Sequence, residues 1–220
     1  KFINEEATEK MLTQIGAKAG DALFFIAEVP GIVEKLAGQI RTELGIRLDI
    51  LEKDIYRFCW IVDFPMYELS DEGKIEFCHN PFSMPQGGME ALNTQEPLDI
   101  LAYQYDIVCN GIELSSGAVR NHDPEIMIKA FEIAGYDKKV IEEKFPALFN
   151  AFHYGAPPHA GIAPGLDRIL MMLKNEQNIR EVIAFPMNSK AEDLLMGAPA
   201  RVTDEQLAEV HIKVVEEENK

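Results

Sequence analysis

The chain contains few cysteines and no long apolar run. Its 220 residues include only three cysteines, Cys59, Cys78 and Cys109, without the paired spacing of a zinc site or a disulfide framework. No run of about 18 apolar residues occurs, and the start, KFINEEATEK, has no apolar signal core. We therefore predict reduced core thiols without chemistry, a cytoplasmic location and no membrane contact.

Several common catalytic and nucleotide-binding motifs are also missing. No GxxxxGK[ST] or GxGxxG follows a strand, so the usual parallel-sheet nucleotide folds lack support. The sequence has no GxSxG and no Cys/His zinc constellation either. Any nucleotide site in this chain must therefore be built differently.

Basic residues are scarce. Lysine and arginine total 21 against 37 aspartates and glutamates, which leaves a net charge of -16. A protein that grips nucleic acid usually presents a basic face, so we do not expect this chain alone to bind RNA strongly. A magnesium–nucleotide site, by contrast, needs carboxylates locally. Charge by itself does not separate an enzyme from an acidic binding domain.

The pattern of residues 1–52 indicates a helix, a strand and a second helix. Asn4 is a helix start and Gly16 a helix stop. Ala22–Glu28 is apolar enough for a buried strand, and a second amphipathic helix ends near Gly45. Nothing here gathers catalytic residue types, so we interpret this α/β unit as a packing or docking module.

Residues 53–220 alternate between strand and helix signals. The aromatic, β-branched run RFCWIVDFPMYE indicates a strand, and Asn110-Gly111 is the strongest hairpin signal in the chain. Strands of hairpin type mixed with helices predict an α+β fold, an antiparallel sheet flanked by helices. The further elements we expect are helices from Asp123 to Gly135 and over Phe145–Phe152, a buried helix GLDRILMML, a strand EVIAFP and a helix over Thr203–Val214.

The hairpin brings two carboxylates together. A two-residue Asn-Gly loop places Asp106 opposite Ser115, so Asp106 and Glu113 fall diagonally on one face. Adjacent carboxylates repel each other, but Mg²⁺ bound with ATP phosphates would satisfy both. An exposed, hydrated polar face is the alternative, and spacing alone leaves both open.

The position of Arg120 is a test of whether these charged residues form one site. It lies seven residues beyond Glu113, and in an unbroken strand this odd spacing would send it to the opposite face. One bulged residue within Ser115–Gly117 would restore the face. We predict such an irregularity.

The run GAPPHAGIAPGLDRIL places Arg168 at the start of an apolar helix. Gly161 and Gly165 permit close backbone approach, and the guanidinium beside a helix N-terminus suits a nucleotide phosphate. A structural ion pair at an Asp-Arg helix start is the alternative. The apolar stripe expected to bury one face of this helix is Leu166, Ile169, Leu170 and Leu173.

Together these motifs resemble the class II aminoacyl-tRNA synthetases, and specifically aspartyl-tRNA synthetases of bacterial type. PPHAGIAPGLDR is similar to their motif 3, PPHGGxAxGLDR, and residues 105–120 match YD(x)3NGxE(x)6R. The resemblance covers essentially the whole chain. It implies that residues 1–52 are the end of an insertion domain, with Lys1 inside that domain. Residues 53–220 would be the C-terminal part of the catalytic domain.

The resemblance implies roles for individual residues. Arg120 would clamp the side-chain carboxylate of L-aspartate; asparagine would instead turn amide hydrogens toward the arginine donors. In FCHNPFSMP, His79 and Asn80 would line the aspartate pocket, although Asn80 departs from the family's second histidine. Asp106 and Glu113 would hold Mg²⁺. Apart from the resemblance, two prolines precede His159, so we expect it to brace its loop; contact with a ligand is the alternative. The implied catalytic residues are Arg168, Glu113 and Asp106, and the implied ATP-binding residues are Glu113, Gly165, Leu166, Asp167 and Arg168.

The implied enzyme activates L-aspartate with ATP to aspartyl-adenylate, transfers it to tRNA and works as a homodimer. This sequence has no match to the family's anticodon-binding barrel, motif 1 or motif 2, so we expect the chain alone to be inactive. A non-catalytic interaction module and an asparaginyl-tRNA synthetase are the alternatives. Magnesium-dependent ATP binding that is lost in Glu113→Ala would favour the enzyme over the module.

Overall fold

The chain forms two compact units. The computed structural model describes residues 3–29 and 31–215; Lys1, expected to lie inside a domain, falls outside them. One unit is Lys1–Ile55 and the other Tyr56–Lys220, close to the division expected after residue 52. Within the part of the chain that is described, no helix is both long and apolar enough to span a bilayer.

The first unit is helical. Helix α1 (Glu5–Ile15) begins at Asn4, whose side chain accepts a hydrogen bond from the Ala7 amide at 2.8 Å, and it ends at left-handed Gly16. Both caps were expected from the sequence. Helix α2 (Ile32–Arg47) continues past Gly45, where we had expected it to end.

The strand expected over Ala22–Glu28 does not form. This stretch has no regular secondary structure and is largely exposed; the exposed fractions of Phe24 and Phe25 are 57% and 63%. A strand needs a neighbour to pair its backbone groups, and the described residues of this unit supply none. The expected α/β character is therefore wrong for the first unit.

The second unit is α+β, as expected. Its sheet has the order β1-β4-β5-β6 with every neighbouring pair antiparallel, and β2 and β3 form a separate small pair. The elements are β1 (Phe58–Pro65), β2 (Tyr67–Leu69), β3 (Ile75–Phe77), α3 (Gly88–Thr94), β4 (Leu101–Cys109), β5 (Ile112–Val119), α4 (Pro124–Ile133), α5 (Lys138–Lys144), α6 (Pro146–Phe152), β6 (Ala160–Pro164), α7 (Leu166–Leu173) and α8 (Asp204–Glu209), with short 3-10 turns at Pro97–Asp99 and Ile179–Glu181.

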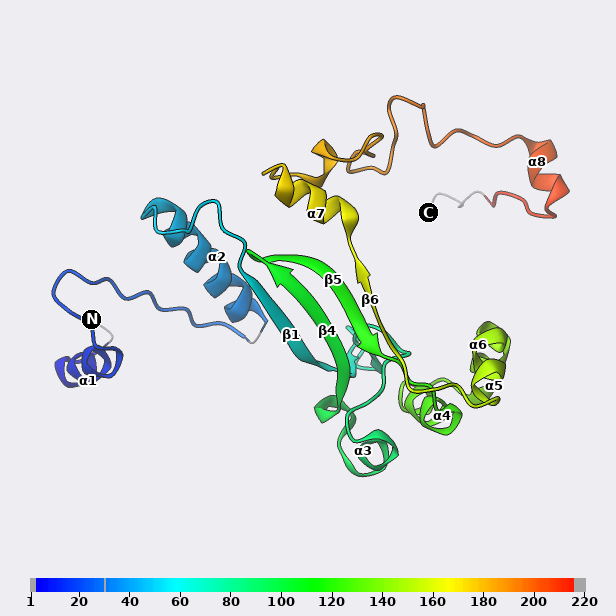
Figure 1. Cartoon of the computed structure of the whole chain (residues 1–220), viewed down its shortest axis with the longest axis horizontal. Helices are drawn as coiled ribbons and strands as arrows, with labels where there is room; N and C mark the ends of the chain where they lie inside the picture. Colours follow the sequence, from blue (N-terminus) through cyan, green and yellow to red (C-terminus); the bar gives the residue numbers. More distant parts are fainter. Residues whose placement is uncertain (1–2, 30, 216–220) are drawn as a thin grey trace. The chain divides into compact units, whose positions relative to one another are not determined.

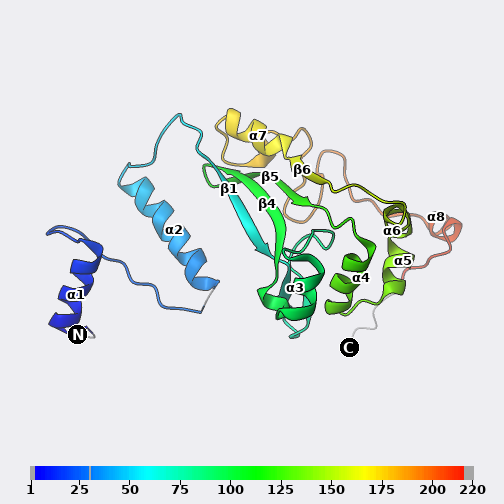
Figure 2. The same cartoon turned by 60° about the horizontal axis from the view of Figure 1, so that its bottom comes forward.

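Helices α3, α4 and α7 lie near the ends of the sheet. Both views show α3 and α4 near one end of the strands, and α7, which contacts β5, near the other (Figures 1 and 2). Helix α4 begins at Asp123, whose carboxylate accepts hydrogen bonds from two backbone amides of the first turn. Gly135 follows this helix at φ 83°, as expected for a helix stop.

Two apolar clusters stabilise the second unit. In the first, the Tyr67 hydroxyl donates a hydrogen bond to the Ala130 carbonyl at 2.9 Å, and burial raises the pKa of Tyr67 above its usual value. The second cluster joins α4, α5 and α6. The buried members are Met66, Tyr67, Leu92, Ile100, Ala102 and Ala130 in the first, and Met127, Phe131, Ile141, Phe149 and Phe152 in the second.

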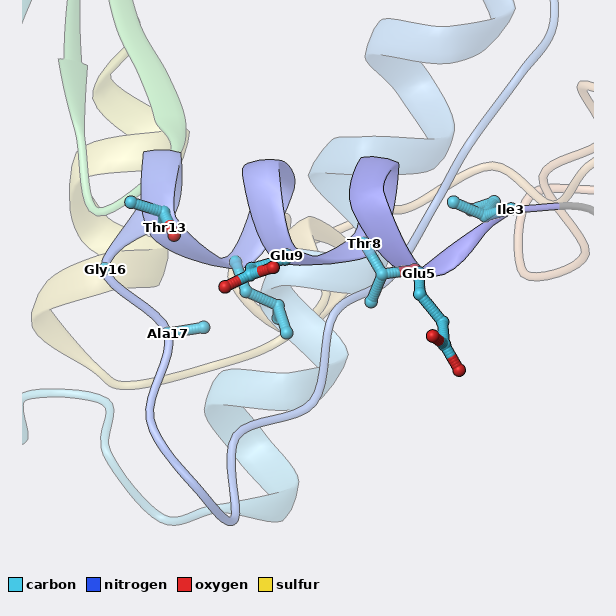
Figure 3. A pocket seen from close by; sticks show the side chains of 8 residues that line it. Ile3, Glu5, Thr8, Glu9, Thr13, Gly16 and Ala17 are labelled. Atoms are coloured by element: carbon cyan, nitrogen blue, oxygen red, sulfur yellow. The ribbon is translucent and has the colours of Figure 1, made fainter.

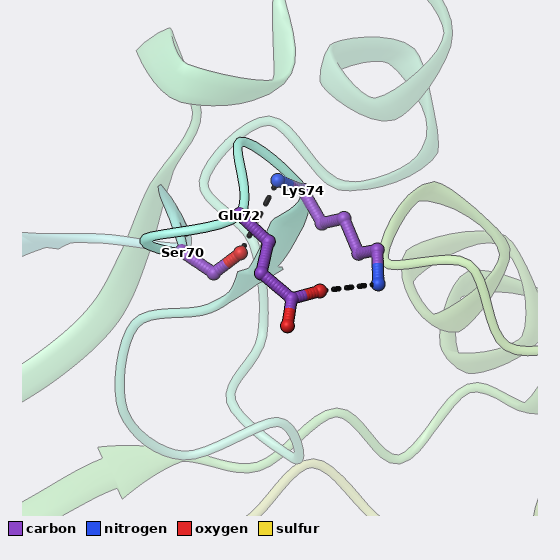
Figure 4. Close-up of polar contacts among 3 residues, drawn as sticks. All are labelled: Ser70, Glu72 and Lys74. Carbon is purple, nitrogen blue, oxygen red and sulfur yellow. Dashed lines mark hydrogen bonds and ion pairs between the residues drawn. The ribbon is translucent and has the colours of Figure 1, made fainter.

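The small β2–β3 pair closes through a polar turn. The Ser70 hydroxyl accepts a hydrogen bond from the Lys74 amide at 3.2 Å, and Lys74 Nζ lies 2.6 Å from Glu72 Oε2 (Figure 4). Both side chains of the ion pair are about three-quarters exposed, so this contact adds little stability. The hydroxyl contact satisfies a backbone donor in the turn.

Three expectations for the C-terminal part are wrong. The stripe on α7 is not buried: Met171 is the buried residue of this helix, and Leu166 is 77% exposed. EVIAFP forms a short 3-10 turn and irregular chain instead of a strand, because no described strand lies alongside to pair with it. Helix α8 starts after Thr203, as expected, but ends at Glu209, two residues before the left-handed His211.

The cysteines are free thiols, as expected, but only Cys109 is a core residue. Cys59 is exposed on β1 and Cys78 is half-buried. Burial raises the pKa of the Cys78 thiol, and so do the charge of Glu68 and its hydrogen bond with the thiol at 3.6 Å. A raised pKa keeps this thiol protonated and poorly nucleophilic.

Candidate active site

A bulge in β5 puts the predicted charged residues on one face of the sheet. The Asn110-Gly111 turn pairs Val108 with Glu113, but the register then shifts so that Leu114 is the extra residue. Asp106 therefore lies opposite Ser116, one residue beyond the partner we expected. The predicted irregularity is confirmed, one position ahead of the expected segment.

The shifted register carries through to the end of the strand. Ser116 faces Asp106 across the ladder and Ala118 faces Gln104. Because side chains alternate along a strand, Arg120 falls on the face of Ala118 and Ser116. This face thus collects Asp106, Glu113 and Arg120; regular alternation would have left Arg120 on the opposite face.

Arg168 contacts Glu113 directly. Its Nη1 donates to Glu113 Oε1 at 2.9 Å and to the Glu113 carbonyl at 2.8 Å. The two side chains remain 44% and 46% exposed, so the pair is open to a ligand. The arginine of α7 is paired with the hairpin carboxylate and not with neighbouring Asp167, which lies in the first turn of the helix.

The start of α7 is fixed to the bulge. The Gly165 amide donates to the Leu114 carbonyl at 2.8 Å, and a Cβ at Gly165 would lie 3.4 Å from the same oxygen. At that distance a side chain would make an ordinary van der Waals contact with the bulged residue, so the packing does not by itself require glycine here. The bulge therefore places both Glu113 and the helix that carries Arg168.

Strand β6 is tied to the sheet by Tyr105. The Tyr105 hydroxyl donates to the Gly161 carbonyl at 3.0 Å. Its ring crosses β5 at Gly117, where a Cβ would lie 2.4 Å from Tyr105 Cε2 and 2.3 Å from the Gly161 oxygen. Gly117 is thus required because Tyr105 of β4 and Gly161 of β6 both come close to the backbone of β5 at this position.

Arg120 has no acidic partner among the residues that the structure describes. Its backbone amide donates to the His159 carbonyl at 2.9 Å, and its Nη2 lies 3.5 Å from where a Cβ at Gly161 would be. Ser83 is its backbone partner in an isolated bridge. The guanidinium therefore lies against a glycine with its donors available for an anion.

The histidines near Arg120 hold their loops. His159 Nδ1 is 2.8 Å from the Pro157 carbonyl, and its ring packs near those of Phe152 and His122. This agrees with the bracing role expected for His159. His79 is exposed, and its ring lies edge-on to Phe64 with centroids 5.2 Å apart.

Asn80 uses its side-chain oxygen within its own loop. Its Oδ1 accepts from the Phe82 amide at 2.9 Å, and its carbonyl oxygen accepts from the Ser83 amide at 3.2 Å and from Gln104 Nε2 at 3.4 Å. Gln104 lies on the same face as Asp106, two residues earlier on β4. Gln104 is not among the residues expected from the sequence, although its two-residue spacing from Asp106 was available as a signal.

The carboxylates of Asp106 and Glu113 are the candidate metal ligands. The described side chains include no group of three or more His, Cys, Asp or Glu able to hold a metal. Two carboxylates on one face instead suit Mg²⁺, which keeps several waters and takes one or two carboxylates together with substrate phosphates. Asp106 and Glu113 are such a pair.

A hollow of about 540 Å³ lies elsewhere, in the first unit (Figure 3). None of the residues predicted from the sequence lines it, and the carboxylates of Glu5 and Glu9 lie at its surface. Its lining comes from α1 and the turn that follows: Ile3, Glu5, Thr8, Glu9, Leu12, Thr13, Gly16 and Ala17.

Comparison with known proteins identifies the class. The family model described as tRNA synthetases class II (D, K and N) matches residues 4–189. The chain belongs to this family, and its antiparallel sheet with motif 3 leading into α7 is consistent with that membership.

Individual relatives are more specific. The chain is 61% identical over 213 residues to an aspartate–tRNA(Asp/Asn) ligase of Zymomonas mobilis, which covers 96% of this chain and 36% of that protein. It is 58% identical over 215 residues to an aspartate–tRNA ligase of Streptomyces avermitilis, covering 97% of the chain and 37% of the relative. A solved aspartyl-tRNA synthetase from Entamoeba histolytica is 24% identical, with a TM-score of 0.47, and covers 86% of this chain and 32% of that one. The chain thus spans little more than a third of the length of the relatives it matches.

Proposed function

We propose that this chain forms part of the catalytic domain of an aspartate–tRNA ligase, which activates L-aspartate with ATP and transfers it to tRNA. One observation carries the proposal: the bulge at Leu114 gathers Asp106, Glu113 and Arg120 on one face. High identity to proteins named as aspartate–tRNA ligases supports it. We propose that the first unit is the end of an insertion domain and that the whole enzyme is a cytoplasmic homodimer.

Arg120 is the residue we assign to substrate choice. Its unpaired guanidinium can meet the side-chain carboxylate of L-aspartate with two parallel hydrogen bonds. Asparagine would direct amide hydrogens at the arginine donors and leave both unsatisfied. His79 and Asn80 belong to the loop beside this arginine, and we assign this loop to the edge of the aspartate pocket.

Arg168, Glu113 and Asp106 are assigned to ATP, with Gly165, Leu166 and Asp167 at the start of α7. The exposed Arg168–Glu113 pair presents one positive and one negative group to a triphosphate and its metal. Bound Mg²⁺ would neutralise phosphate charge. The α-carboxylate of aspartate would attack the α-phosphate of ATP in line, so that aspartyl-adenylate forms as the bond to the β-phosphate breaks and pyrophosphate leaves. The side chains act by positioning the substrates and by stabilising charge.

Binding to the 220-residue chain tests the proposal. Arg120→Ala should weaken L-aspartate binding by on the order of 100-fold, because a charged bidentate contact is lost, and should leave Mg-ATP binding nearly intact. Arg168→Ala and Glu113→Ala should show the opposite selectivity. Arg180→Ala is the matched control, since this arginine donates to the Met187 carbonyl in another part of the second unit. Equal binding by Arg120→Ala and the unsubstituted chain would contradict the assignment.

Turnover is a separate matter. No segment of this sequence matches the motif 2 strands that carry the family's other ATP-binding arginine, so we propose that the chain alone binds substrates without catalysis. Aspartate-dependent exchange between ATP and pyrophosphate measures this directly. Robust exchange that disappears in Arg168→Ala would refute it.

A further inference from the structure

The loop that carries Asn80 leads into a segment that lies between two strands of the sheet. The last ladder pair of β4 and β5 is Gln104 with Ala118. Beyond that pair the Met84 amide donates to the Val119 carbonyl, and the Tyr103 amide donates to the Met84 carbonyl, both at 2.9 Å. The segment 83–86 therefore occupies the place where β4 and β5 separate, and Ser83 forms a backbone bridge with Arg120, so the position of this segment sets the backbone beside Arg120.

Asn80 shapes the start of this segment with its side-chain oxygen. Oδ1 is the acceptor for the Phe82 amide at 2.9 Å, a local turn that asparagine side chains commonly form. By accepting this hydrogen bond, the Asn80 side chain holds the start of the loop in a turn and so acts as a loop cap. On the far side of the turn, the Phe82 ring packs against Phe131 and Phe145, so one end of the loop is anchored in the apolar cluster.

Gln104 holds the other end. It is only 7% exposed, and its Nε2 donates to the Asn80 carbonyl at 3.4 Å. The opposing residue in the ladder is Ala118, whose small side chain leaves room for the amide on this face. A buried amide that meets a loop carbonyl fixes the loop relative to the strand that also carries Asp106.

We propose that Gln104 is a positioning residue for the aspartate pocket and that Asn80 acts as a loop cap rather than as a direct ligand of aspartate. The pocket edge is thus set by a clamp: the Gln104 amide on the Asn80 carbonyl, and the Asn80 oxygen on the Phe82 amide. This deepens the proposed function and rests on it for the identity of the ligand, but the clamp itself is present without ligand.

Hydrogen exchange of the Phe82 amide tests the clamp in the ligand-free 220-residue chain. Gln104→Met keeps the length of the side chain and removes the donor, and Asn80→Ala removes the acceptor, so exchange should become about three- to tenfold faster in both. Asn80→Asp retains an acceptor oxygen and should restore the slow exchange. Tyr103→Phe, the neighbour on the opposite face, is the control. Unchanged exchange in Gln104→Met would overturn the clamp.

Titration with L-aspartate then separates positioning from direct contact. Gln104→Met and Asn80→Ala should weaken binding by about three- to tenfold, whereas Asn80→Asp should bind within about twofold of the unsubstituted chain. A carboxylate at position 80 would repel a substrate carboxylate in direct contact, so loss of binding in Asn80→Asp would overturn the loop-cap role. If the unsubstituted chain binds no aspartate, the proposed function fails for this chain, and hydrogen exchange alone decides the clamp.

Discussion

The two units of this chain both contain helix caps and apolar periodicity in their sequences, but only the second unit buries many of its apolar side chains. Helix α1 has clear caps at both ends, yet Gly45 is the buried residue among the described positions of the first unit. The second unit buries two apolar clusters and ties strands together over long stretches of sequence. Amphipathic pattern and caps are therefore enough to form a helix but not to form a core, because burial needs a second surface.

The largest difference between the units should appear on removing a core side chain. Ile141→Ala deletes a fully buried side chain of the second cluster and should lower the free energy of unfolding by about 2–5 kcal/mol. Ile15→Ala, at a residue 55% exposed on α1, should change it by less than about 0.5 kcal/mol. Urea unfolding followed by the fluorescence of Trp60, which packs against Tyr105 in the second unit, and by circular dichroism measures both. Equal losses of unfolding free energy in Ile141→Ala and Ile15→Ala would contradict the difference in burial between the two units.

Glycine substitutions should have opposite signs in the two units. Gly117→Ala would place a Cβ 2.3 Å from the Gly161 oxygen and should destabilise the second unit by about 1–3 kcal/mol. Gly38→Ala meets nothing within 4 Å in α2 and should stabilise that helix by about 0.5–1 kcal/mol. The same unfolding experiments report both signs. A stabilising Gly117→Ala would contradict the close packing of β4, β5 and β6.

Removing a helix cap should destabilise α1 and α4 by similar amounts, but only in α4 should it lower the unfolding free energy of a whole unit. Asn4→Ala and Asp123→Ala each remove an oxygen that accepts from the first turn, and each should cost about 1 kcal/mol. In α4 the loss should lower the unfolding free energy of the second unit, because this helix contributes to both clusters. In α1 it should reduce helix content alone. Circular dichroism beside Trp60 fluorescence distinguishes the two, and a change of Trp60 unfolding in Asn4→Ala would show that the units are coupled.

The smallest effect should come from the long-range hydrogen bond between Tyr105 and Gly161. In residues 3–29 and 31–50, by contrast, the described side-chain hydrogen bonds join residues at most four positions apart. Tyr105→Phe removes the bond to the Gly161 carbonyl and should cost about 0.5–1.5 kcal/mol. Tyr103→Phe, at a tyrosine two residues earlier on β4 that is 47% exposed, is the control and should be neutral. Faster amide exchange in β6 would locate the loss there, whereas identical behaviour of the two variants would show that the hydroxyl does not hold this strand.

Much of the local structure was predictable from particular residues. Asn4, Gly16, Asp123 and Gly135 mark helix ends because their side chains or backbone freedom act within a few residues. Asn110-Gly111 closed the expected turn, with both residues at positive φ. These predictions succeeded because each depends on a short stretch of chain.

The predictions that were wrong concern segments that need a neighbouring strand or surface. Ala22–Glu28 and EVIAFP are apolar enough for strands, but no described strand lies beside them. The stripe of α7 has helical spacing, yet Leu166 is exposed. A pattern predicts which face is apolar, and only a neighbouring surface can bury it.

The sequence by itself determined the ends of α1 and α4, the hairpin turn, the candidate charged residues and the need for a bulge between Glu113 and Arg120. Only the tertiary structure decided that Leu114 is the bulged residue, that Arg168 pairs with Glu113, and that Gln104 meets the Asn80 carbonyl. The physical reason is distance along the chain. Hairpin alternation is set by adjacent residues, whereas contacts across 24 or 55 positions depend on how β4, β5 and β6 pack together.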